Sequence, residues 1–207
     1  MTSIERLVRE NIRRLRPYSS ARHEFEGEAE VFLDANENPY DHRGLNRYPD
    51  PLQQAVKERL AALKSVPPTQ IFLGNGSDEA IDLLIRIFCE PRRDHIVTLP
   101  PTYGMYQVSA DIADVAVREV PLSPGFQPQV EAVLDAADAH SKLLFVCSPN
   151  NPTGNAIDRD AIRRLAAGFP GIVVIDEAYI DFSNRPGCLD LLPEFPNLVF
   201  MQTFSKA

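Results

Sequence analysis

Three residues whose side chains can do chemistry each follow or end a short apolar run in this sequence: Asn151, Asp176 and Lys206. Lysine amines form Schiff bases with carbonyl compounds, more readily where burial or nearby charge lowers the pKa of the amine. A carboxylate at the end of a buried strand is costly without a charged or hydrogen-bonding partner, and a protonated pyridine nitrogen is such a partner. Each residue also has an ordinary explanation, because lone lysines near strand ends are usually solvated and strand-end aspartates are common.

Asn151 lies in residues 148–154, whose sequence is SPNNPTG. Two prolines and a glycine restrict the backbone here, so the loop can present the Asn151 amide rigidly. An amide held in this way can donate to a ligand oxygen. A structural turn uses similar residues, but this string is more particular than a turn requires.

Residues 74–79 (GNGSDE) follow an apolar run at 71–73, which we expect to be a strand, and precede a helical pattern. The glycines allow a tight turn, and Ser77 or Asp78 can cap the helix. The N–H groups of the first helical turn, together with the helix dipole, form a natural phosphate site. The alternative is a capped turn without a ligand, which this motif taken alone favours.

Residues 100–106 (PPTYGMY) follow another apolar run, and Tyr103 is the notable residue in them. A tyrosine at a strand end can offer a flat face on which an aromatic ligand stacks. Packing in the core is the alternative for this side chain, and the sequence favours neither.

Short apolar runs alternate with helical patterns from about residue 50 onward. The expected strands are residues 95–99, 116–120, 143–147, 172–175 and 198–201. The expected helices are residues 51–63, 78–88, 103–112, 128–139 and 158–167. This alternation indicates an α/β fold with a mainly parallel sheet and helices on both faces. Ligands bind such sheets beyond the carboxyl ends of the strands, which is where Asn151, Asp176 and Lys206 fall.

Composition excludes several classes of protein. The 207 residues carry a formal net charge of −8 without a Lys/Arg-rich run, which argues against nucleic acid or an anionic membrane as partner. No apolar run approaches the roughly 20 residues of a membrane span, and the first residues lack the apolar core of a secretory signal. Cys89, Cys147 and Cys188 lack metal-ligand spacing and adjoin apolar stretches, so we expect buried free thiols, no metal site and a cytoplasmic protein.

Taken together, these strings resemble the fold-type I aminotransferases that depend on pyridoxal 5′-phosphate (PLP), and within them the histidinol-phosphate aminotransferases. The resemblance runs from Arg16-Pro17-Tyr18 to the last residue. FLDANENP at residues 32–39 and RYPD at 47–50 favour the second group, whereas the Asn-Pro-Thr-Gly and Ser-Lys strings are shared by many aminotransferases. The resemblance implies that residues 1–45 are an N-terminal arm with a small-domain segment. Residues 46–207 would be the PLP-binding large domain, incomplete at its carboxyl end.

The resemblance also implies a role for each strand-end residue. Lys206 would hold PLP through its amine and move a proton between the substrate α-carbon and the cofactor. Asp176 would pair with the pyridine nitrogen and keep it protonated. Asn151 and Tyr179 would hydrogen-bond the phenolic oxygen, and Tyr103 would stack on the ring. The cofactor then does the carbanion chemistry, while the protein supplies orientation and electrostatics.

A phosphate cradle and a substrate end complete the implied site, with Lys206, Asp176 and Tyr179 as its catalytic residues. Tyr18 and Asn36 would lie at the substrate end of the cleft. The implied assembly is a homodimer with shared active sites. The residues implied for the cofactor phosphate are Ser77, Asp78, Ser205 and, reaching across from the partner subunit, Tyr48.

The implied reaction is reversible ping-pong amino transfer between histidinol phosphate and 2-oxoglutarate in histidine biosynthesis. Its partners are therefore a small-molecule amino donor and a 2-oxo acid. Another aminotransferase, a phosphothreonine decarboxylase of the same scaffold and an inactive fragment of such an enzyme are the alternatives. Nicotinamide binding is not expected, since no G-x-G-x-x-G string opens a helix in the sequence.

The resemblance further implies a longer polypeptide than these 207 residues. A phosphate-binding arginine would follow shortly after Lys206, and a small domain would supply arginines for the acidic groups of the substrate. A chain that ended at Ala207 is expected to bind PLP weakly and to show negligible transamination.

Overall fold

The computed structural model of the chain describes residues 4–18, 31, 33–40, 43 and 45–206. The chain divides into two compact units, which are described separately below. The larger unit combines Met1–Arg14 with Gly74–Ala207, and the smaller unit is Leu15–Leu73. The predicted domain division after residue 45 stays a prediction.

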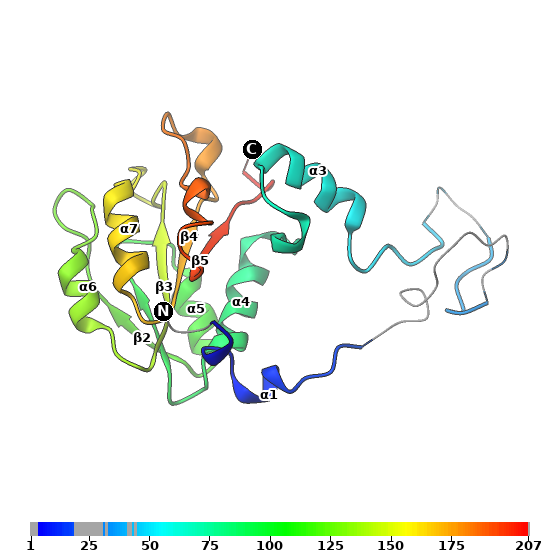
Figure 1. Cartoon of the computed structure of the whole chain (residues 1–207), viewed down its shortest axis with the longest axis horizontal. Helices are drawn as coiled ribbons and strands as arrows, with labels where there is room; N and C mark the ends of the chain where they lie inside the picture. Colours follow the sequence, from blue (N-terminus) through cyan, green and yellow to red (C-terminus); the bar gives the residue numbers. More distant parts are fainter. Residues whose placement is uncertain (1–3, 19–30, 32, 41–42, 44, 207) are drawn as a thin grey trace. The chain divides into compact units, whose positions relative to one another are not determined.

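A five-stranded sheet forms the centre of the larger unit (Figure 1). All neighbouring strands are parallel, and their spatial order is β2-β1-β3-β4-β5. The strands are β1 (His95–Thr98), β2 (Ala116–Glu119), β3 (Ser141–Cys147), β4 (Ile172–Asp176) and β5 (Leu198–Met201). Each of the five corresponds to an expected strand, and the expected parallel sheet is confirmed.

Helices cover both faces of this sheet, as expected (Figure 1). The helices are α4 (Gly76–Phe88), α5 (Met105–Ile112), α6 (Val130–Ala136) and α7 (Arg159–Gly168). Ile81 of α4 packs in one core cluster with Leu143 of β3, whereas Ile162 of α7 packs in the other with Leu144 of β3. Because successive strand residues point to opposite faces, each face of the sheet has its own core.

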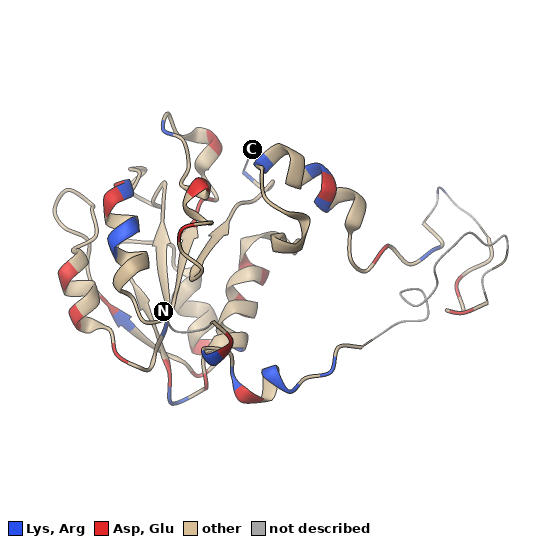
Figure 2. Cartoon of the chain, in the orientation of Figure 1, with Lys and Arg blue, Asp and Glu red and all other residues tan. Residues whose placement is uncertain are grey.

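Charged residues of both signs are distributed over the helices and the connections between elements (Figure 2). Arg164 of α7 pairs with Glu131 of α6. Arg159 of α7 donates to Asp190 of η4 (Leu189–Leu191), and this hydrogen bond lowers the pKa of the Asp190 carboxyl. Another short helix, η3 (Ile180–Phe182), lies earlier in the same connection between β4 and β5. Exposed ion pairs of this kind stabilise a fold only slightly, so the cores carry most of the stability.

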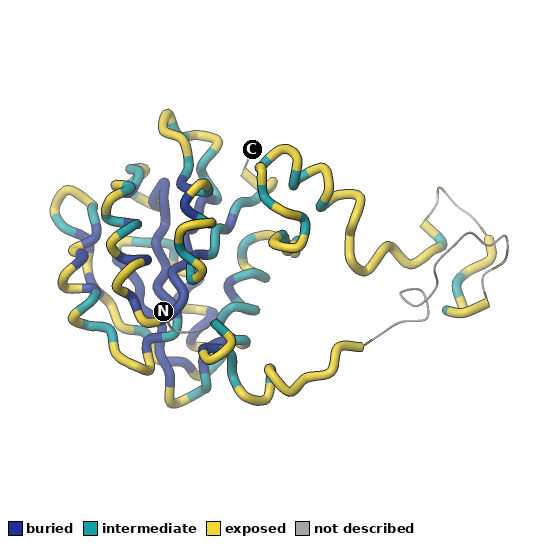
Figure 3. The backbone as a smooth tube through the Cα atoms, in the orientation of Figure 1, coloured by how far each residue is buried: buried dark blue, intermediate teal, exposed yellow. Residues whose placement is uncertain are grey.

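The central strands are buried along their length, whereas β2 at the sheet edge is largely exposed (Figure 3). Cys89, Cys147 and Cys188 are buried free thiols, as expected. Burial, with smaller contributions from neighbouring charges, raises the pKa of Cys89 to about 12. Within the described residues, no helix combines the length and the apolar character that crossing a bilayer requires.

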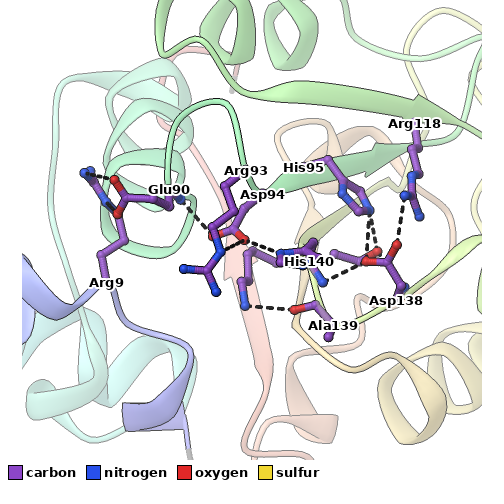
Figure 4. A network of polar contacts seen from close by, with 11 residues as sticks. Arg9, Glu90, Arg93, Asp94, His95, Arg118, Asp138, Ala139 and His140 are labelled. Carbon is purple, nitrogen blue, oxygen red and sulfur yellow. Dashed lines mark hydrogen bonds and ion pairs between the residues drawn. The ribbon is translucent and has the colours of Figure 1, made fainter.

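The first described residues pack against the end of α4 (Figure 4). They form η1 (Ile4–Arg6) and α1 (Glu10–Arg13). Leu7 is buried in the same core cluster as Ile85 of α4. Arg9 Nε donates to Glu90 Oε2 (3.0 Å), and the Arg9 backbone N–H donates to the Ile87 carbonyl (2.9 Å). Residues 4–13 therefore pack as part of the larger unit and do not form a core of their own.

A polar network lies at the amino ends of β1 and β3 (Figure 4). His95 Nε2 is 2.6 Å from Ser141 Oγ, and His140 Nδ1 is 3.1 Å from Asp94 Oδ1. Burial, followed by the positive charge of Arg118, lowers the pKa of His95. The network lies at the sheet edge opposite to the carboxyl strand ends.

The smaller unit contains α3 (Gln54–Lys64) and η2 (Pro68–Gln70), and none of its described residues is buried. The expected helix at residues 51–63 is confirmed, with a later start. The strand expected at residues 71–73 is wrong, since these residues have no ladder partner and Phe72 is 60% exposed. A run of three apolar residues is too short to distinguish a strand from an extended connection.

Candidate active site

The carboxyl ends of β3, β4 and β5 meet at one edge of the sheet. Cys147, Asp176 and Met201, the last residues of these strands, are neighbours in register. The pairing continues one step further, since the N–H of Ser148 donates to the Asp176 carbonyl (2.9 Å) and that of Glu177 to the Met201 carbonyl (2.8 Å). The segments that carry Asn151, Tyr179 and Lys206 therefore start from one edge, as parallel strands require.

Asp176 is buried at this edge, with 2% of its surface exposed. Its Oδ2 accepts a hydrogen bond from the Tyr106 hydroxyl (2.6 Å), and its Oδ1 accepts one from the Ala178 N–H (3.0 Å). Burial raises the pKa of the Asp176 carboxyl, these two hydrogen bonds oppose that rise, and the charge of Asp78 adds to it. A buried carboxylate of this kind gains from a cationic partner.

Tyr106 is a residue of this site that sequence reasoning missed. Its side chain is fully buried and stacks on Phe145 of β3, with ring centroids 4.5 Å apart. Burial, followed by the charge of Asp176, raises the pKa of the Tyr106 hydroxyl well above its usual value, so this hydroxyl remains a donor. The signal available in the sequence was that Tyr106 comes one helical turn after Tyr103. In the structure the two rings meet edge to face, with their centroids 5.7 Å apart.

Tyr103 reaches the beginning of α4. Its hydroxyl donates to Asp78 Oδ1 (3.2 Å), and its ring is half-buried. Burial, followed by the Asp78 charge, raises the pKa of the Tyr103 hydroxyl. Through Tyr106, Tyr103 is also connected to Asp176, so three of the expected cofactor-binding residues form one chain of contacts.

Helix α4 begins at Gly76, whose φ of +74° favours glycine, and it carries Ser77 and Asp78 in its first turn. Asn75 occupies the N-cap position without a side-chain capping bond, so the prediction that Ser77 or Asp78 caps the helix is wrong. With the left-handed backbone at Gly76, the helix begins two residues before its expected start at residue 78. First-turn N–H groups lack acceptors within a helix, and the helix dipole favours an anion beside them.

Asn150 anchors the loop that carries Asn151. Its side chain is buried, and its Nδ2 donates to the Pro101 carbonyl (2.9 Å) and to Thr153 Oγ1 (2.7 Å). Gly154 closes the turn with a φ of +76°, a conformation that other residues rarely adopt. Sequence reasoning missed this anchoring residue, although it lies inside the SPNNPTG string. The loop presents Asn151 half-buried at the strand edge.

Lys206 and Tyr179 come together although they follow different strands. Lys206 Nζ lies 5.6 Å from the centroid of the Tyr179 ring. Lys206 and Ser205 are exposed, and the Ser205 N–H donates to Thr203 Oγ1 (3.1 Å), which shapes the turn before the lysine. A cation near an aromatic face is attracted to it, so the Tyr179 ring favours this position of the amine.

The remaining predicted residues lie in the smaller unit. Tyr18 is 91% exposed and Tyr48 is 67% exposed. Asn36 is exposed with a φ of +51°, which asparagine tolerates better than most residues. Their predicted contacts with cofactor and substrate stay predictions.

A cavity of about 500 Å³ adjoins Asn151 and Tyr179, and Phe182 and Arg185 also line it. Its volume is within the range of small-molecule sites. A second cavity of about 540 Å³ lies at the amino ends of β1 and β2, away from these residues. Within the described part of the chain, no group of three His, Cys, Asp or Glu residues could hold a metal ion.

Relatives of this chain carry a consistent set of names. A histidinol-phosphate aminotransferase of Cytophaga hutchinsonii is 55% identical to this chain in an alignment of 208 positions. The alignment covers 99% of this chain and 60% of that protein. One of Parabacteroides distasonis is 57% identical over 207 residues, which is 100% of this chain and 60% of that protein. This chain thus spans about 60% of the length of these relatives.

Solved structures share the fold. A histidinol-phosphate aminotransferase from Sinorhizobium meliloti in complex with pyridoxal-5′-phosphate matches with a TM-score of 0.70 at 24% identity, over 77% of this chain and 44% of that chain. Aspartate aminotransferase from Thermus thermophilus with maleate matches with a TM-score of 0.65 at 27% identity, over 75% and 42%. The family model described as aminotransferase class I and II matches residues 22–207. Because that match includes the whole sheet and each of its strand ends, the chain belongs to the class I and II aminotransferase family.

Proposed function

We propose that the protein is a PLP-dependent aminotransferase that exchanges an amino group between histidinol phosphate and 2-oxoglutarate. The observation that carries the proposed PLP chemistry is the buried Asp176 carboxylate. Asp176 pairs with Met201, the last residue of β5, and Lys206 follows that strand. The substrate part is supported by the names of relatives that are 55% and 57% identical to this chain.

The residues at the strand ends fit PLP. Burial raises the pKa of the Asp176 carboxyl, so a protonated pyridine nitrogen beside it would replace lost solvation with an opposite charge. The first turn of α4, opened by Gly76, suits a phosphate group. Lys206 supplies the amine that PLP chemistry requires, and Asn151 and Tyr179 supply donors for a phenolic oxygen.

PLP, when bound, supplies an electron sink for negative charge at the substrate α-carbon. Lys206 would hold the cofactor through its amine and, once the substrate amine has replaced it there, would carry the proton that leaves the substrate α-carbon. Asp176 keeps a proton on the pyridine nitrogen, and Tyr106 and the Ala178 N–H orient its carboxylate for that task. Tyr103, which lies just before α5, would stack on the cofactor ring. Ser77, Asp78 and Ser205 are proposed to hold the phosphate.

The test uses the natural protein at its full length. Borohydride reduction after PLP loading, followed by peptide mass mapping, is expected to place the reduced adduct on Lys206. Turnover of histidinol phosphate with 2-oxoglutarate is expected in the unchanged protein and lost in Lys206→Ala. Lys142→Ala is the matched control, because Lys142 lies at the opposite end of β3 and its Nζ donates to the Ala139 carbonyl.

Two results would overturn the proposal. An adduct on another lysine, or near-normal turnover by Lys206→Ala, would remove the assigned chemistry. Release of carbon dioxide from O-phosphothreonine without amino transfer would replace the assigned reaction with decarboxylation.

We further propose a homodimer with shared active sites in the cytoplasm, with no nucleic acid or membrane partner. The smaller unit supports the dimer, because its described residues expose large apolar side chains that a partner surface could cover. These include Leu33, Tyr40, Leu45, Tyr48, Leu63 and Phe72.

Mixing inactive variants tests this assembly. If Tyr48 of one subunit serves the site that contains the partner subunit's Lys206, co-expression of Tyr48→Ala with Lys206→Ala creates one intact site per mixed dimer. Activity is then expected to reappear in the mixture. A monomer in light scattering, or no recovery on mixing, would contradict shared sites.

A further inference from the structure

The residue after Asp176 is a second buried carboxylate with a different set of contacts. Glu177 is 2% exposed, and its backbone N–H donates to the Met201 carbonyl (2.8 Å), which extends the pairing of β4 with β5. Its Oε1 accepts a hydrogen bond from the Cys188 N–H (2.8 Å), and its Oε2 accepts one from Gln202 Nε2 (2.8 Å). The carboxylate therefore joins two segments that are distant in sequence.

The fit around Glu177 is close. A Cβ placed on Gly187 would lie 2.7 Å from Glu177 Oε1, which is shorter than real Cβ contacts allow. Glycine at this position thus lets the backbone approach the carboxylate. Burial, followed by the negative charge of Glu177, raises the pKa of the Cys188 thiol. These contacts hold the chain just before η4 against the end of β4.

The second contact acts on the segment that contains Lys206. Gln202 directly follows β5, and Lys206 follows it after the short turn that Thr203 and Ser205 stabilise. The amine of Lys206 lies near the ring of Tyr179, which is two residues after Glu177. Glu177 is therefore bonded to the base of the lysine segment and linked through the chain to the ring beside the amine.

We propose that Glu177 is a positioning residue whose carboxylate fixes Gln202 and thereby holds Lys206 beside Tyr179. The importance of this position for catalysis rests on the function proposed above for Lys206. Glu177 itself touches neither substrate nor cofactor in this proposal. Its ionised oxygens hold two donors more firmly than a neutral acceptor would, because hydrogen bonds to a charged acceptor are stronger.

Single substitutions separate the two contacts. Gln202→Met keeps the length of the side chain but removes the donor to Glu177 Oε2, and it leaves the Cys188 contact in place. Glu177→Gln removes the charge, so any hydrogen bond that remains between the amides at 177 and 202 is a neutral one. In each variant, amide hydrogen exchange of residues 203–206 is expected to rise about tenfold, the effect of losing one charge-assisted hydrogen bond. Exchange at residues 183–188 is expected to stay unchanged in Gln202→Met.

The swapped double variant provides the rescue. In Glu177→Gln combined with Gln202→Glu, the amide at 177 can donate to a carboxylate at 202 while its oxygen still accepts from the Cys188 N–H. Exchange of residues 203–206 is expected to return to the rate of the unchanged protein. The rate at which PLP attaches to Lys206, and kcat per attached PLP, are expected to fall about tenfold in the single variants and to recover in the swap. KM for 2-oxoglutarate is expected to remain unchanged.

Two control variants remove similar groups elsewhere. Gln129→Met deletes an amide that donates to the Pro121 carbonyl, and Glu131→Gln neutralises the exposed partner of Arg164. Both are expected to leave residues 203–206 and PLP attachment unchanged.

The proposal is overturned if the single variants leave exchange at 203–206 unchanged, or if the swapped variant does not restore it. It is also overturned if exchange rises equally throughout the protein in proportion to lost stability. Hydrogen exchange needs no cofactor, so this result stands whether or not PLP attaches. Absence of PLP attachment to Lys206 in the unchanged protein contradicts only the proposed function.

Discussion

The Tyr106 hydroxyl donates a 2.6 Å hydrogen bond to Asp176 Oδ2 across 70 residues of sequence. Both side chains are buried, and the other carboxylate oxygen accepts from the Ala178 N–H at 3.0 Å. Each oxygen of Asp176 thus has a donor, which offsets part of the cost of burying the charge. The same bond fixes the direction in which the carboxylate can meet a cation.

Tyr106→Phe tests this bond, because it removes the hydroxyl and keeps the ring that stacks on Phe145. Loss of a donor to a buried charge is expected to lower the free energy of unfolding by about 1–3 kcal/mol at neutral pH. The pKa of Asp176 is expected to rise further, since the hydroxyl stabilises the ionised form. Urea unfolding measures the first effect, and the acid limb of PLP binding, followed by absorbance, measures the second.

Tyr103→Phe is the control for that experiment. Its hydroxyl bonds to the exposed Asp78 at 3.2 Å, so its removal is expected to cost less than about 1 kcal/mol. Equal losses in the free energy of unfolding for Tyr106→Phe and Tyr103→Phe would show that the hydrogen bond to Asp176 stabilises the fold no more than the exposed one to Asp78.

Asp176→Asn is expected to stabilise the protein without PLP and to disable catalysis. The folded state raises the pKa of Asp176, so the unfolded chain ionises first as pH rises above 3.8. Stability is therefore lost as pH rises from that value through the folded pKa, and the penalty persists at neutral pH. Asparagine removes the penalty, because its oxygen accepts from the Ala178 N–H and its amide donates to Tyr106.

Urea unfolding of the PLP-free proteins at pH 7 and at pH 4 checks this prediction. The stability gain of Asp176→Asn over its parent is expected to shrink at the lower pH. With PLP bound, turnover is expected to fall about 10²- to 10³-fold, as when one preorganised electrostatic group is removed. A variant that is less stable than its parent at pH 7 would mean that the charge is already compensated in the PLP-free protein.

Much of the sheet could be predicted because its strands are short apolar runs that must be buried on both faces. The runs that end at Cys147 and Asp176 are almost wholly buried in the structure. Parallel order then brings the residues after the strands to one edge without any knowledge of side-chain contacts. This is why Asp176 and the segments of Asn151 and Lys206 could be grouped from their sequence positions.

Contacts between distant side chains could not be predicted in this way. The sequence positions of Tyr106 and Glu177 do not reveal their partners, because these are set by the packing of α5 and by the connection between β4 and β5. The start of α4 was also missed, because Asn75, Ser77 and Asp78 are all acceptable N-cap residues and the left-handed Gly76 decides among them.

The His95 imidazole is expected to make the protein less stable in mild acid. Burial and the charge of Arg118 lower the pKa of His95 from 6.5, although Asp138 and Asp94 oppose this. As pH falls below about 6.5, the unfolded chain takes up a proton before the folded protein does, so stability falls until the folded pKa is passed. Thermal unfolding between pH 7.5 and 5 measures the slope, and His95→Gln is expected to flatten it.

Arg118→Met is the companion variant. Without the positive charge, the pKa of His95 is depressed less, and the slope is expected to become shallower while the histidine remains. An unchanged slope in both variants would assign the acid sensitivity to other groups.

Gly171→Ala is expected to destabilise the sheet where β4 begins. A Cβ at Gly171 would lie 2.4 Å from the Lys142 carbonyl oxygen and 2.6 Å from that of Ser141. These are backbone atoms of the neighbouring β3, so relief requires the two strands to move apart. Overpacking of this kind costs about 1–3 kcal/mol, and urea unfolding measures the loss.

Gly104→Ala is the matched control for that substitution. Gly104 has helical backbone angles, φ −69° and ψ −19°, and a Cβ there meets no atom within 4 Å. Alanine restricts the unfolded chain without straining the folded one, so this variant is expected to be neutral or up to about 1 kcal/mol more stable. If both variants lose similar stability, the cost comes from alanine itself. A loss confined to Gly171→Ala would trace it to the close approach of β3 and β4, the two strands that position Asn151 and Asp176.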